Sequence, residues 1–343
     1  MSEQRLQELT ARFAQVTIAV LGDFFLDKYL DVAPKLAEVS VETGKTAHQV
    51  TCERHSPGAA GTIVCNLAAL GAGAVHAIGY TGDDGSSYDM RKDLAALNCH
   101  TDHLHVVPGR MTPTYLKPRD KDHPGLPGEH SRYDTKNRTP TPEAVQQQMI
   151  DSLDQLLPTL KALIVLDQVE ERDCGVVTAR VRETLADRAQ SHRHVVFWAD
   201  SRHRIRLFSD VLTKVNQFEL VGRTNPTPGD RVELDQLVAA IIRARTRTGA
   251  PVCVTRGPLG MLVSDPEPTV VPGVRLKGPI DETGAGDGAT AGAVLALAAG
   301  ASLAEAALVG NLVASITVQQ LGTTGTASVD ELAPRLEMWQ DQR

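Results

Sequence analysis

A short stretch between Asp281 and Gly300 carries residues whose types and spacing suit phosphate chemistry. Gly284, Gly286 and Gly288 lie within five residues, and the acid Asp287 stands between the last two. An alanine-rich run without proline or charge follows, which predicts a helix. Glycines let backbone N–H groups approach a ligand closely, and the first N–H groups of a helix have no intrahelical acceptor. This pattern therefore predicts an anion site, and phosphate is the usual anion.

Asp287 does not fit a site that only holds phosphate, because a carboxylate repels phosphate. We interpret Asp287 as a general base that takes a proton from a hydroxyl attacking the phosphate. General-base catalysis typically contributes about 10²–10⁴ in rate, whereas a helix dipole contributes about 0.3–2 kcal/mol. The alternative is a glycine-rich turn whose Asp caps a buried helix.

The elements that position this stretch alternate between helices and apolar strands. The first predicted strand, Val16–Leu21, is a short apolar run that ends at Gly22 and Asp23. From Thr141 onward, amphipathic helical segments alternate with short apolar runs. This alternation predicts an α/β fold with a central, mostly parallel sheet and helices on both faces. The predicted helices are 145–157, 176–189 and 234–246, and the predicted strands are 162–166, 195–199 and 252–255.

Two segments, at about 31–56 and 101–136, depart from this pattern. The first is polar and β-branched, and the second is rich in proline. We interpret both as insertions that form a small β lid beside the main sheet. The chain has no internal repeat and no low-complexity linker, so we expect residues 1–343 to form a single domain with this lid.

Composition limits the classes of partner. The 343 residues carry a net charge of −7, which argues against a nucleic-acid or anionic-membrane partner. No uncharged run is apolar enough to span a bilayer, and the N-terminus reads as a polar amphipathic helix rather than a signal peptide. Five scattered cysteines suggest reduced thiols. We therefore expect a soluble, cytoplasmic protein.

Four short sequence motifs occur in a characteristic order along the chain. They are a strand ending in GD at 22–23, PGAAG at 57–61, VTRG at 254–257 and DETGAGDGATAG at 281–292. In this order they resemble the ribokinase/PfkB family of carbohydrate kinases, over about 16–325. The last one stands where that family has D-T-T-G-A-G-D. The resemblance implies a ribokinase-like fold, ATP and Mg²⁺ as cofactors, and a small sugar or sugar phosphate as substrate.

The resemblance assigns roles around the glycine-rich turn. It implies that Asp287 deprotonates the sugar hydroxyl and that the amides of Gly284, Ala285 and Gly286 stabilise the transferred phosphoryl group. This agrees with the chemistry, because phosphoryl transfer depends on positioning and charge stabilisation. The family pattern also places a monovalent cation such as K⁺ beside Asp281 and Thr283.

Substrate ligands are expected near the first strand and the following helix. Asp23 and Asp27, in GDFFLD, are carboxylates suited to sugar hydroxyls; the alternative is that they cap the turn or are solvated. Gly58, Ala59 and Thr62 match the family's G-G-A-x-x-N helix start. Ala59 replaces the second Gly and Thr62 replaces the Asn, so the sugar preference of the family cannot be carried over.

The nucleotide site rests on two weaker motif matches and on Asn311, which falls where the family has an Asn beside the adenine. Asn216 and Glu219 match the family's N-x-x-E motif, which implies that Glu219 orders Mg²⁺ through water; the alternative is a helix N-cap with an acidic first turn. Thr255 and Gly257 match the T-x-G of the ATP-facing loop. The resemblance therefore implies the following nucleotide-binding residues: Asn216, Glu219, Thr255, Gly257, Gly260 and Asn311.

The lid carries basic residues that are candidates for a substrate phosphate. MTPTYLKPRD and EHSRYD resemble the P-T-x-x-K-x-R and R-x-D segments of the heptose 7-phosphate kinase branch of the family. Lys117, Arg119 and Arg132 would then contact a phosphate already on the substrate, or else form a solvated face of the lid. The acidic LDQVEERDC at 166–174 replaces a basic segment of that branch.

These observations favour an ATP- and magnesium-dependent sugar kinase. Two alternatives stay open, namely a nucleoside kinase of the same fold and a sugar-binding regulator without turnover. A dinucleotide-dependent dehydrogenase is disfavoured because no G-x-G-x-x-G follows the first strand. An exposed lid sheet also predicts a homodimer, since an open sheet edge or face invites a partner.

Overall fold

The computed structural model describes residues 1–123, 128–227, 229–322 and 324–343. Residues 124–127 belong to the predicted lid segment 101–136 and lie outside this description. Within the described ranges, no helix has both the length and the apolar character needed to cross a membrane.

The main sheet of the described chain has ten strands in the order β16-β15-β14-β13-β12-β11-β1-β6-β7, with β8 also pairing with β6. The pairs from β14 to β7 are parallel, whereas β15 is antiparallel to both of its neighbours. The strands are β1 (Thr17–Gly22), β6 (Ala74–Thr81), β7 (Cys99–His100), β8 (Leu104–Val106), β11 (Ala162–Asp167), β12 (Val196–Ser201), β13 (Leu212–Asn216), β14 (Val252–Thr255), β15 (Met261–Val263) and β16 (Thr269–Val271).

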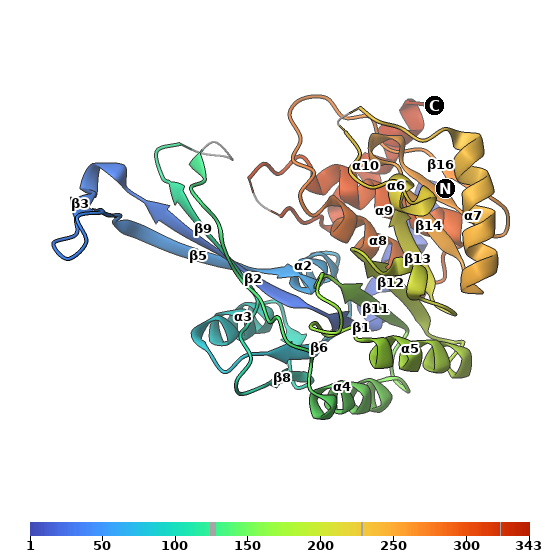
Figure 1. The fold of residues 1–343 in the computed structure, drawn as a ribbon. Helices are drawn as coiled ribbons and strands as arrows, with labels where there is room; N and C mark the ends of the chain where they lie inside the picture. The colour runs from blue at the N-terminus through green and yellow to red at the C-terminus, as the bar shows by residue number, and fades with distance from the viewer. Residues whose placement is uncertain (124–127, 228, 323) are drawn as a thin grey trace.

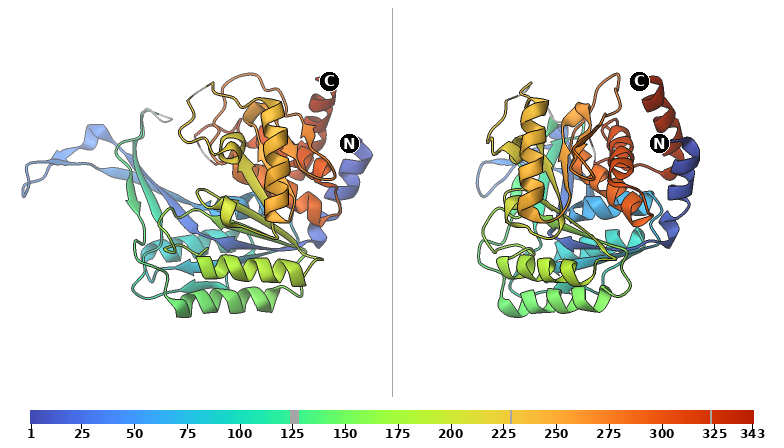
Figure 2. Two further views of the ribbon diagram at one scale, coloured as in Figure 1. Left: turned by 45° about the vertical axis from the view of Figure 1, so that its right-hand side comes forward. Right: turned by 90° about the vertical axis from the view of Figure 1, so that its right-hand side faces the viewer.

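Helices cover both faces of this sheet (Figures 1 and 2). Successive strand residues point to opposite faces, so Ile18 and Val20 of β1 pack in one core, whereas Ala19 and Leu21 pack in the other. The fold class predicted from the sequence is confirmed. The core on the face of Ile18 and Val20 includes residues of α1 (Glu3–Thr10), α2 (Ala60–Ala69), α3 (Gly85–Ala96), α8 (Ala285–Ala298), α9 (Leu303–Thr317) and α10 (Leu332–Asp341). The core on the face of Ala19 and Leu21 includes residues of α4 (Glu143–Leu156), α5 (Ala179–Ser191) and α7 (Leu234–Thr248), and α6 (Gln217–Val221) packs against it.

A second sheet, which we call the lid, projects away from the α/β body (Figure 1). Its strand order is β10-β9-β2-β5, and the central pair of β2 and β9 is parallel. The lid strands are β2 (Phe24–Val32), β5 (Val50–Ala59), β9 (Thr114–Asp120) and β10 (Tyr133–Thr135), and a separate strand pair, β3 (Glu38–Val39) and β4 (Thr46–Ala47), extends beyond them.

The lid has different limits from the predicted segments. Its first strand starts at Phe24 and its second ends at Ala59, so it is longer than 31–56. The other predicted segment, 101–136, starts too early, because β8 pairs with β6 of the main sheet. Residues 104–106 join the main sheet rather than the lid because Leu104, like Cys99 of β7, is buried in the main core.

Helices α8 and α9 pack at very short range because glycines face the contact. A Cβ added to Gly310 would lie 2.7 Å from the Ala289 carbonyl oxygen, and one added to Gly292 would lie 2.7 Å from Val313 Cγ2. The carbonyl belongs to the backbone of α8 and cannot move aside as a flexible side chain can. This packing holds the helix that begins at the glycine-rich turn.

We predict that Gly310→Ala lowers the free energy of unfolding by about 1–3 kcal/mol, because overpacking outweighs the better helix propensity of alanine. Urea denaturation measures the effect as a lower midpoint. Gly85→Ala is the matched control, because Gly85 also lies in a helix but has open space around its Cβ position. Equal midpoints for the Gly310 variant and the wild type would contradict this account of the packing.

Candidate active site

The glycine-rich turn lies at the start of α8, where the first N–H groups of the helix have no intrahelical acceptor. Gly284 is the N-cap in the left-handed conformation, with a φ of 76°, which glycine adopts at little cost. Among the described residues, the N–H groups of Gly284, Gly286 and Asp287 have no hydrogen-bond acceptor. The Ala285 N–H instead donates to the Glu282 carbonyl at 3.1 Å. In this conformation the Ala285 amide is therefore not free for an anion, unlike the amides on either side of it.

Asp287 lies in the first turn of α8 and is partly buried; the neighbouring Gly286 lies beside Lys214 near the carboxyl end of β13. Burial raises the pKa of its carboxyl to about 7; the Asp200 charge adds to this rise, and the Lys214 ammonium opposes it. A pKa near neutrality suits a general base, because the group is then partly ionised and still accepts a proton readily. The alternative role as a helix cap finds no support, since the Asp287 carboxylate makes no capping hydrogen bond with a described residue.

Lys214 and Asp200 form a buried ion pair beneath this turn. They are cross-strand partners on β13 and β12, and Lys214 Nζ lies 2.6 Å from Asp200 Oδ2. Lys214 Nζ also lies 3.1 Å from the position of a Cβ on Gly286. Burial lowers the pKa of Lys214, but the charge and hydrogen bond of Asp200, together with the charges of Asp287 and Glu219, outweigh burial, so the pKa is raised. The sequence prediction missed this pair, although a lone lysine inside the apolar strand Leu212–Val215 is an unusual feature that could have identified it.

Asn216 and Glu219 form a capping box at the start of α6. The Asn216 side chain accepts from the Phe218 and Glu219 N–H groups at 2.9 Å, and Glu219 accepts from the Asn216 N–H at 2.7 Å. This is the capping geometry considered from sequence. Burial, together with the charge of Asp200, raises the pKa of Glu219. Its role toward Mg²⁺ stays a prediction, and the described residues contain no cluster of three or more metal-ligating side chains.

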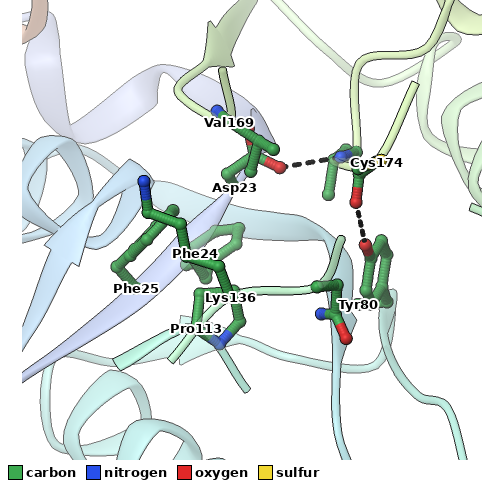
Figure 3. A pocket seen from close by; sticks show the side chains of 10 residues that line it. Asp23, Phe24, Phe25, Tyr80, Pro113, Lys136, Val169 and Cys174 are labelled. Carbon is green, nitrogen blue, oxygen red and sulfur yellow. Dashed lines mark hydrogen bonds between the residues drawn. The ribbon is translucent and has the colours of Figure 1, made fainter. Parts of the chain in front are cut away.

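The Asp23 carboxylate is occupied by backbone N–H groups. It accepts from Gln168 at 2.8 Å, from Val169 at 3.0 Å and from Val176 at 2.7 Å, and so ties the loop after β11 to the end of β1. Figure 3 shows Asp23 and Val169 side by side at a small cavity. Burial raises the pKa of Asp23 to about 6, and the nearby charge of Asp167 contributes. A sugar hydroxyl would have to share these oxygens with the backbone, so the ligand role of Asp23 stays a prediction.

The lid cations proposed from sequence are all ion-paired. Lys117 Nζ lies 2.7 Å from Asp27 Oδ1, and Arg119 Nε lies 3.8 Å from Asp31 Oδ1. The Arg132 guanidinium donates to both Asp134 oxygens, at 2.7 and 2.9 Å. Their contact with a phosphate on the substrate stays a prediction.

The start of α2 brings the predicted substrate residues to the start of α8. Ala59, the N-cap of α2, has a positive φ of 51°, which explains why glycine suits this position. The Ala60 N–H donates to the Asp23 carbonyl at 3.1 Å. The Thr62 methyl lies 3.5 Å from the position of a Cβ on Gly284. Gly58 lies close to Asp27, since a Cβ there would meet the Asp27 carboxylate at 2.5 Å.

The other predicted nucleotide residues surround the turn after β14. Gly257 and Gly260 have φ values of 56° and 86°, and a Cβ on Gly260 would lie 2.3 Å from the Gly273 nitrogen. Asn311 is buried and donates to the Val271 and Pro272 carbonyls at 3.1 and 3.2 Å, which holds the end of β16, against which Gly260 packs. The Thr255 hydroxyl donates to the Val215 carbonyl at 3.4 Å.

Asp281 fixes the segment before the glycine-rich turn. Its carboxylate accepts from the Thr283 N–H at 3.0 Å and from the Gly322 N–H at 3.2 Å. The hydrogen bonds from Thr283 and Gly322 hold the pKa of Asp281 below its usual value. A monovalent cation beside Asp281 and Thr283 stays a prediction.

Comparison with known proteins identifies relatives over nearly the whole chain. Residues 18–330 match the pfkB family carbohydrate kinase. "Bifunctional protein HldE" of Caulobacter vibrioides is 30% identical over 324 residues, which are 94% of this chain and 64% of that protein. The chain therefore spans less than two thirds of this curated relative.

Solved structures match the fold at lower identity. Ribokinase from Cryptococcus neoformans, in complex with ADP, has a TM-score of 0.65 at 21% identity, covering 93% of this chain and 99% of that one. Phosphofructokinase-2 from Escherichia coli, in complex with substrates and products, has a TM-score of 0.68 at 20% identity, covering 96% and 100%. The ribokinase-like fold predicted from the sequence is confirmed.

The charges around Asp287 predict a pH profile. As a base it must be ionised, so kcat/KM should fall tenfold per pH unit well below pH 7. Lys214→Met should move this acid limb to higher pH, because the cation that lowers the pKa of Asp287 is removed. Lys277→Met, which removes an exposed lysine, is the control and should leave the limb in place. An unchanged limb in the Lys214 variant would rule out this electrostatic coupling.

Proposed function

The chain belongs to the pfkB family of carbohydrate kinases, and on that premise we propose that it transfers the γ-phosphate of ATP to a hydroxyl of a sugar or sugar phosphate. The observation that carries the proposal is Asp287, whose pKa is raised to about 7, at a helix start where the N–H groups of Gly284 and Gly286 have no acceptor among the described residues. A base and an anion site then lie side by side, as transfer from a phosphate ester to a hydroxyl requires.

In this proposal Asp287 accepts the proton of the attacking hydroxyl. The N–H groups of Gly284 and Gly286 donate to the oxygens of the phosphoryl group as it is transferred. The Ala285 N–H joins them only if its bond to the Glu282 carbonyl opens. Lys214 offsets the negative charge that gathers at the turn, while Asp200 keeps the lysine ionised and fixed in place.

The residues present fit a nucleotide with a magnesium ion. Asp200 lies on β12, and Glu219 is in α6, which directly follows the neighbouring strand β13. Both carboxylates are therefore at the carboxyl ends of adjacent strands, and Mg²⁺ prefers such oxygens, directly or through water. When bound, Mg-ATP supplies the phosphoryl group, and the ion neutralises part of its charge. We propose that Glu219 with Asn216 faces the ion, and that the turn with Thr255, Gly257, Gly260 and Asn311 faces the nucleotide. K⁺ beside Asp281 and Thr283 is part of the same proposal.

On the substrate side, we propose that Asp23, Asp27 and the start of α2 face the sugar. Residues 1–343 would act as one domain, whose lid closes over the substrate and excludes water. A cytoplasmic location follows from the supply of ATP there and agrees with five free cysteines. A nucleoside kinase and a sugar-binding regulator without turnover remain the alternatives that an assay must separate.

We also propose that the chain forms a homodimer through the lid. The lid sheet ends in two edge strands, β10 and β5, and the tip beyond it exposes Leu36, Val39 and Val41. Exposed apolar side chains beside an open sheet edge are unusual on a monomer. A second copy of the chain would cover both features.

We predict that Asp287→Asn lowers turnover by two decades or more, because the amide cannot accept the hydroxyl proton. Affinity for Mg-ATP should change little, since Asn keeps the shape of the turn. ADP release with Mg-ATP over a panel of free sugars, sugar phosphates and nucleosides measures turnover, and calorimetry measures nucleotide binding.

Each outcome of the panel decides between the candidates. Turnover confined to nucleosides would favour the nucleoside kinase. Sugar binding without any turnover would favour the regulator. Near-normal turnover by the Asp287 variant on an accepted sugar would remove Asp287 from the mechanism.

For the dimer, we predict that the double variant Val39→Asp and Val41→Asp sediments as one chain, whereas the wild type sediments as two. Charged side chains on the apolar tip would be costly to bury between copies. Analytical ultracentrifugation measures both masses. A wild-type protein that sediments as a single chain at micromolar concentration would exclude the homodimer.

A further inference from the structure

The chain that follows β11, which we call the 168–176 loop, forms one wall of the cavity beside Asp23. Three residues of this loop line the cavity: Val169, Cys174 and Val176 (Figure 3). A Cβ added to Gly175 would lie 2.6 Å from Asp23 Oδ1 and 2.8 Å from Val169 Cβ, so the chain passes very close to the carboxylate. A small shift of this loop would therefore also move the Asp23 side chain.

Arg204, three residues after β12, holds the first half of the loop. Its guanidinium donates to both oxygens of the buried Asp167, at 2.6 and 3.0 Å. It also donates to the Glu170 carbonyl at 2.9 Å and to the Val169 carbonyl. The N–H of Val169 in turn donates to Asp23 at 3.0 Å. A single loop residue is therefore bound by Arg204 on one side and by the Asp23 carboxylate on the other.

Arg110, in the segment between β8 and β9, holds the second half of the loop. It is buried and donates to the Cys174 carbonyl at 3.2 Å, to the Tyr80 hydroxyl at 3.0 Å and to the Thr141 hydroxyl at 3.1 Å. The Tyr80 hydroxyl donates to the same Cys174 carbonyl at 2.9 Å (Figure 3). The Thr141 hydroxyl donates to the Gly175 carbonyl at 2.7 Å. The N–H that directly follows Gly175 is one of the three that bind the Asp23 carboxylate.

The partners of Arg110 in the described chain are neutral. Besides the three oxygens just named, they are the carbonyl and hydroxyl of Thr139 and the carbonyl of Pro140. Buried cations are usually paired with an acid, so simple charge pairing does not account for this arginine. Its planar fork of N–H donors instead joins several acceptors in fixed directions, which a lysine cannot do.

The bonds that the loop makes to Asp23 limit how this carboxylate can bind a ligand. A carboxylate has about four acceptor positions, two on each oxygen. The N–H groups of Gln168 and Val169 both bind Oδ2, whereas Oδ1 accepts from Val176 alone. One position is then left, on Oδ1, and the absence of a side chain at Gly175 keeps this oxygen clear. The loop therefore sets the direction from which a hydroxyl can reach Asp23.

We propose that Arg204 and Arg110 are positioning residues for substrate binding, which hold the 168–176 loop so that Asp23 presents one oxygen to a single sugar hydroxyl. This inference rests on the proposed function and deepens it. Neither arginine has to touch the substrate, because each acts through the backbone of the loop. Alignment of this kind matters because a charge-assisted hydrogen bond weakens when its acceptor is displaced.

Arg204→Lys and Arg110→Lys test the proposal, because lysine keeps the charge but cannot form the forked contacts. Hydrogen–deuterium exchange of the 168–176 amides should become about tenfold faster in each variant, while exchange in α8 stays as in the wild type. With a sugar accepted in the ADP-release assay, KM for the sugar should rise by about tenfold or more, as the loss of one charge-assisted hydrogen bond implies. KM for Mg-ATP should stay within about twofold of the wild type, because the nucleotide does not bind through this loop.

Two further variants complete the test. Arg172→Lys is the matched control, because Arg172 lies on the same loop with its side chain 88% exposed and contacts the neighbouring Asp173. It should leave exchange and both KM values unchanged. Thr141→Val removes the hydroxyl between Arg110 and the Gly175 carbonyl with little change in volume. It should show the same two effects as Arg110→Lys, and it replaces that variant if urea denaturation shows that Arg110→Lys does not fold.

Three results would overturn the proposal: unchanged exchange of the loop in Arg204→Lys, faster exchange without a rise in KM for the sugar, or an equal rise in KM for the sugar and for Mg-ATP. The last result would indicate a general loss of structure instead of a role in substrate binding. A wild type that releases no ADP with any member of the panel would overturn the proposed function. The exchange measurement needs no substrate, so it would still decide whether the two arginines hold the loop.

Discussion

Charge compensation beneath the start of α8 is the constraint on which the rest of this structure depends. A base at Asp287 must ionise next to Asp200 and still allow a phosphate to approach, so a cation has to be buried among them. Lys214 meets this need only because β12 and β13 are in register, with its Nζ 2.6 Å from Asp200. Removing either partner would leave a buried charge uncompensated, which is costly.

The same region joins the elements that carry the two halves of the proposed site. Helix α2 begins where the Ala60 N–H meets the Asp23 carbonyl, and its Thr62 reaches the turn at Gly284. Asp23 in turn holds the loop after β11 through three backbone N–H groups. The turn proposed to hold the anion, the residues proposed to face the sugar and the base of the lid are therefore mechanically connected, which suits a reaction that depends on alignment.

Local patterns allowed most of the fold and the glycine-rich turn to be predicted from the sequence. The alternation of apolar strands and helices, and the spacing of Gly284, Gly286 and Asp287, are visible without any tertiary contact. Pairing between residues that are distant in the sequence cannot be seen in such local patterns. Lys214 with Asp200, and Lys117 with Asp27, depend on strand register, and strand β8 joined the main sheet because Leu104 is buried there. The bond from the Ala285 N–H to the Glu282 carbonyl is likewise a conformational detail that residue types do not specify.

The central claim is that the turn at 284–287 holds the transferred phosphoryl group while Asp287 takes the proton. A crystal structure with ADP, aluminium fluoride and an accepted sugar tests this most directly, because the fluoride complex imitates the phosphoryl group in transfer. The account predicts the complex bound by the N–H groups of Gly284 and Gly286, with Asp287 in hydrogen-bond distance of the attacking hydroxyl. A fluoride complex held elsewhere, or a hydroxyl bonded to another acid such as Asp27, would contradict it.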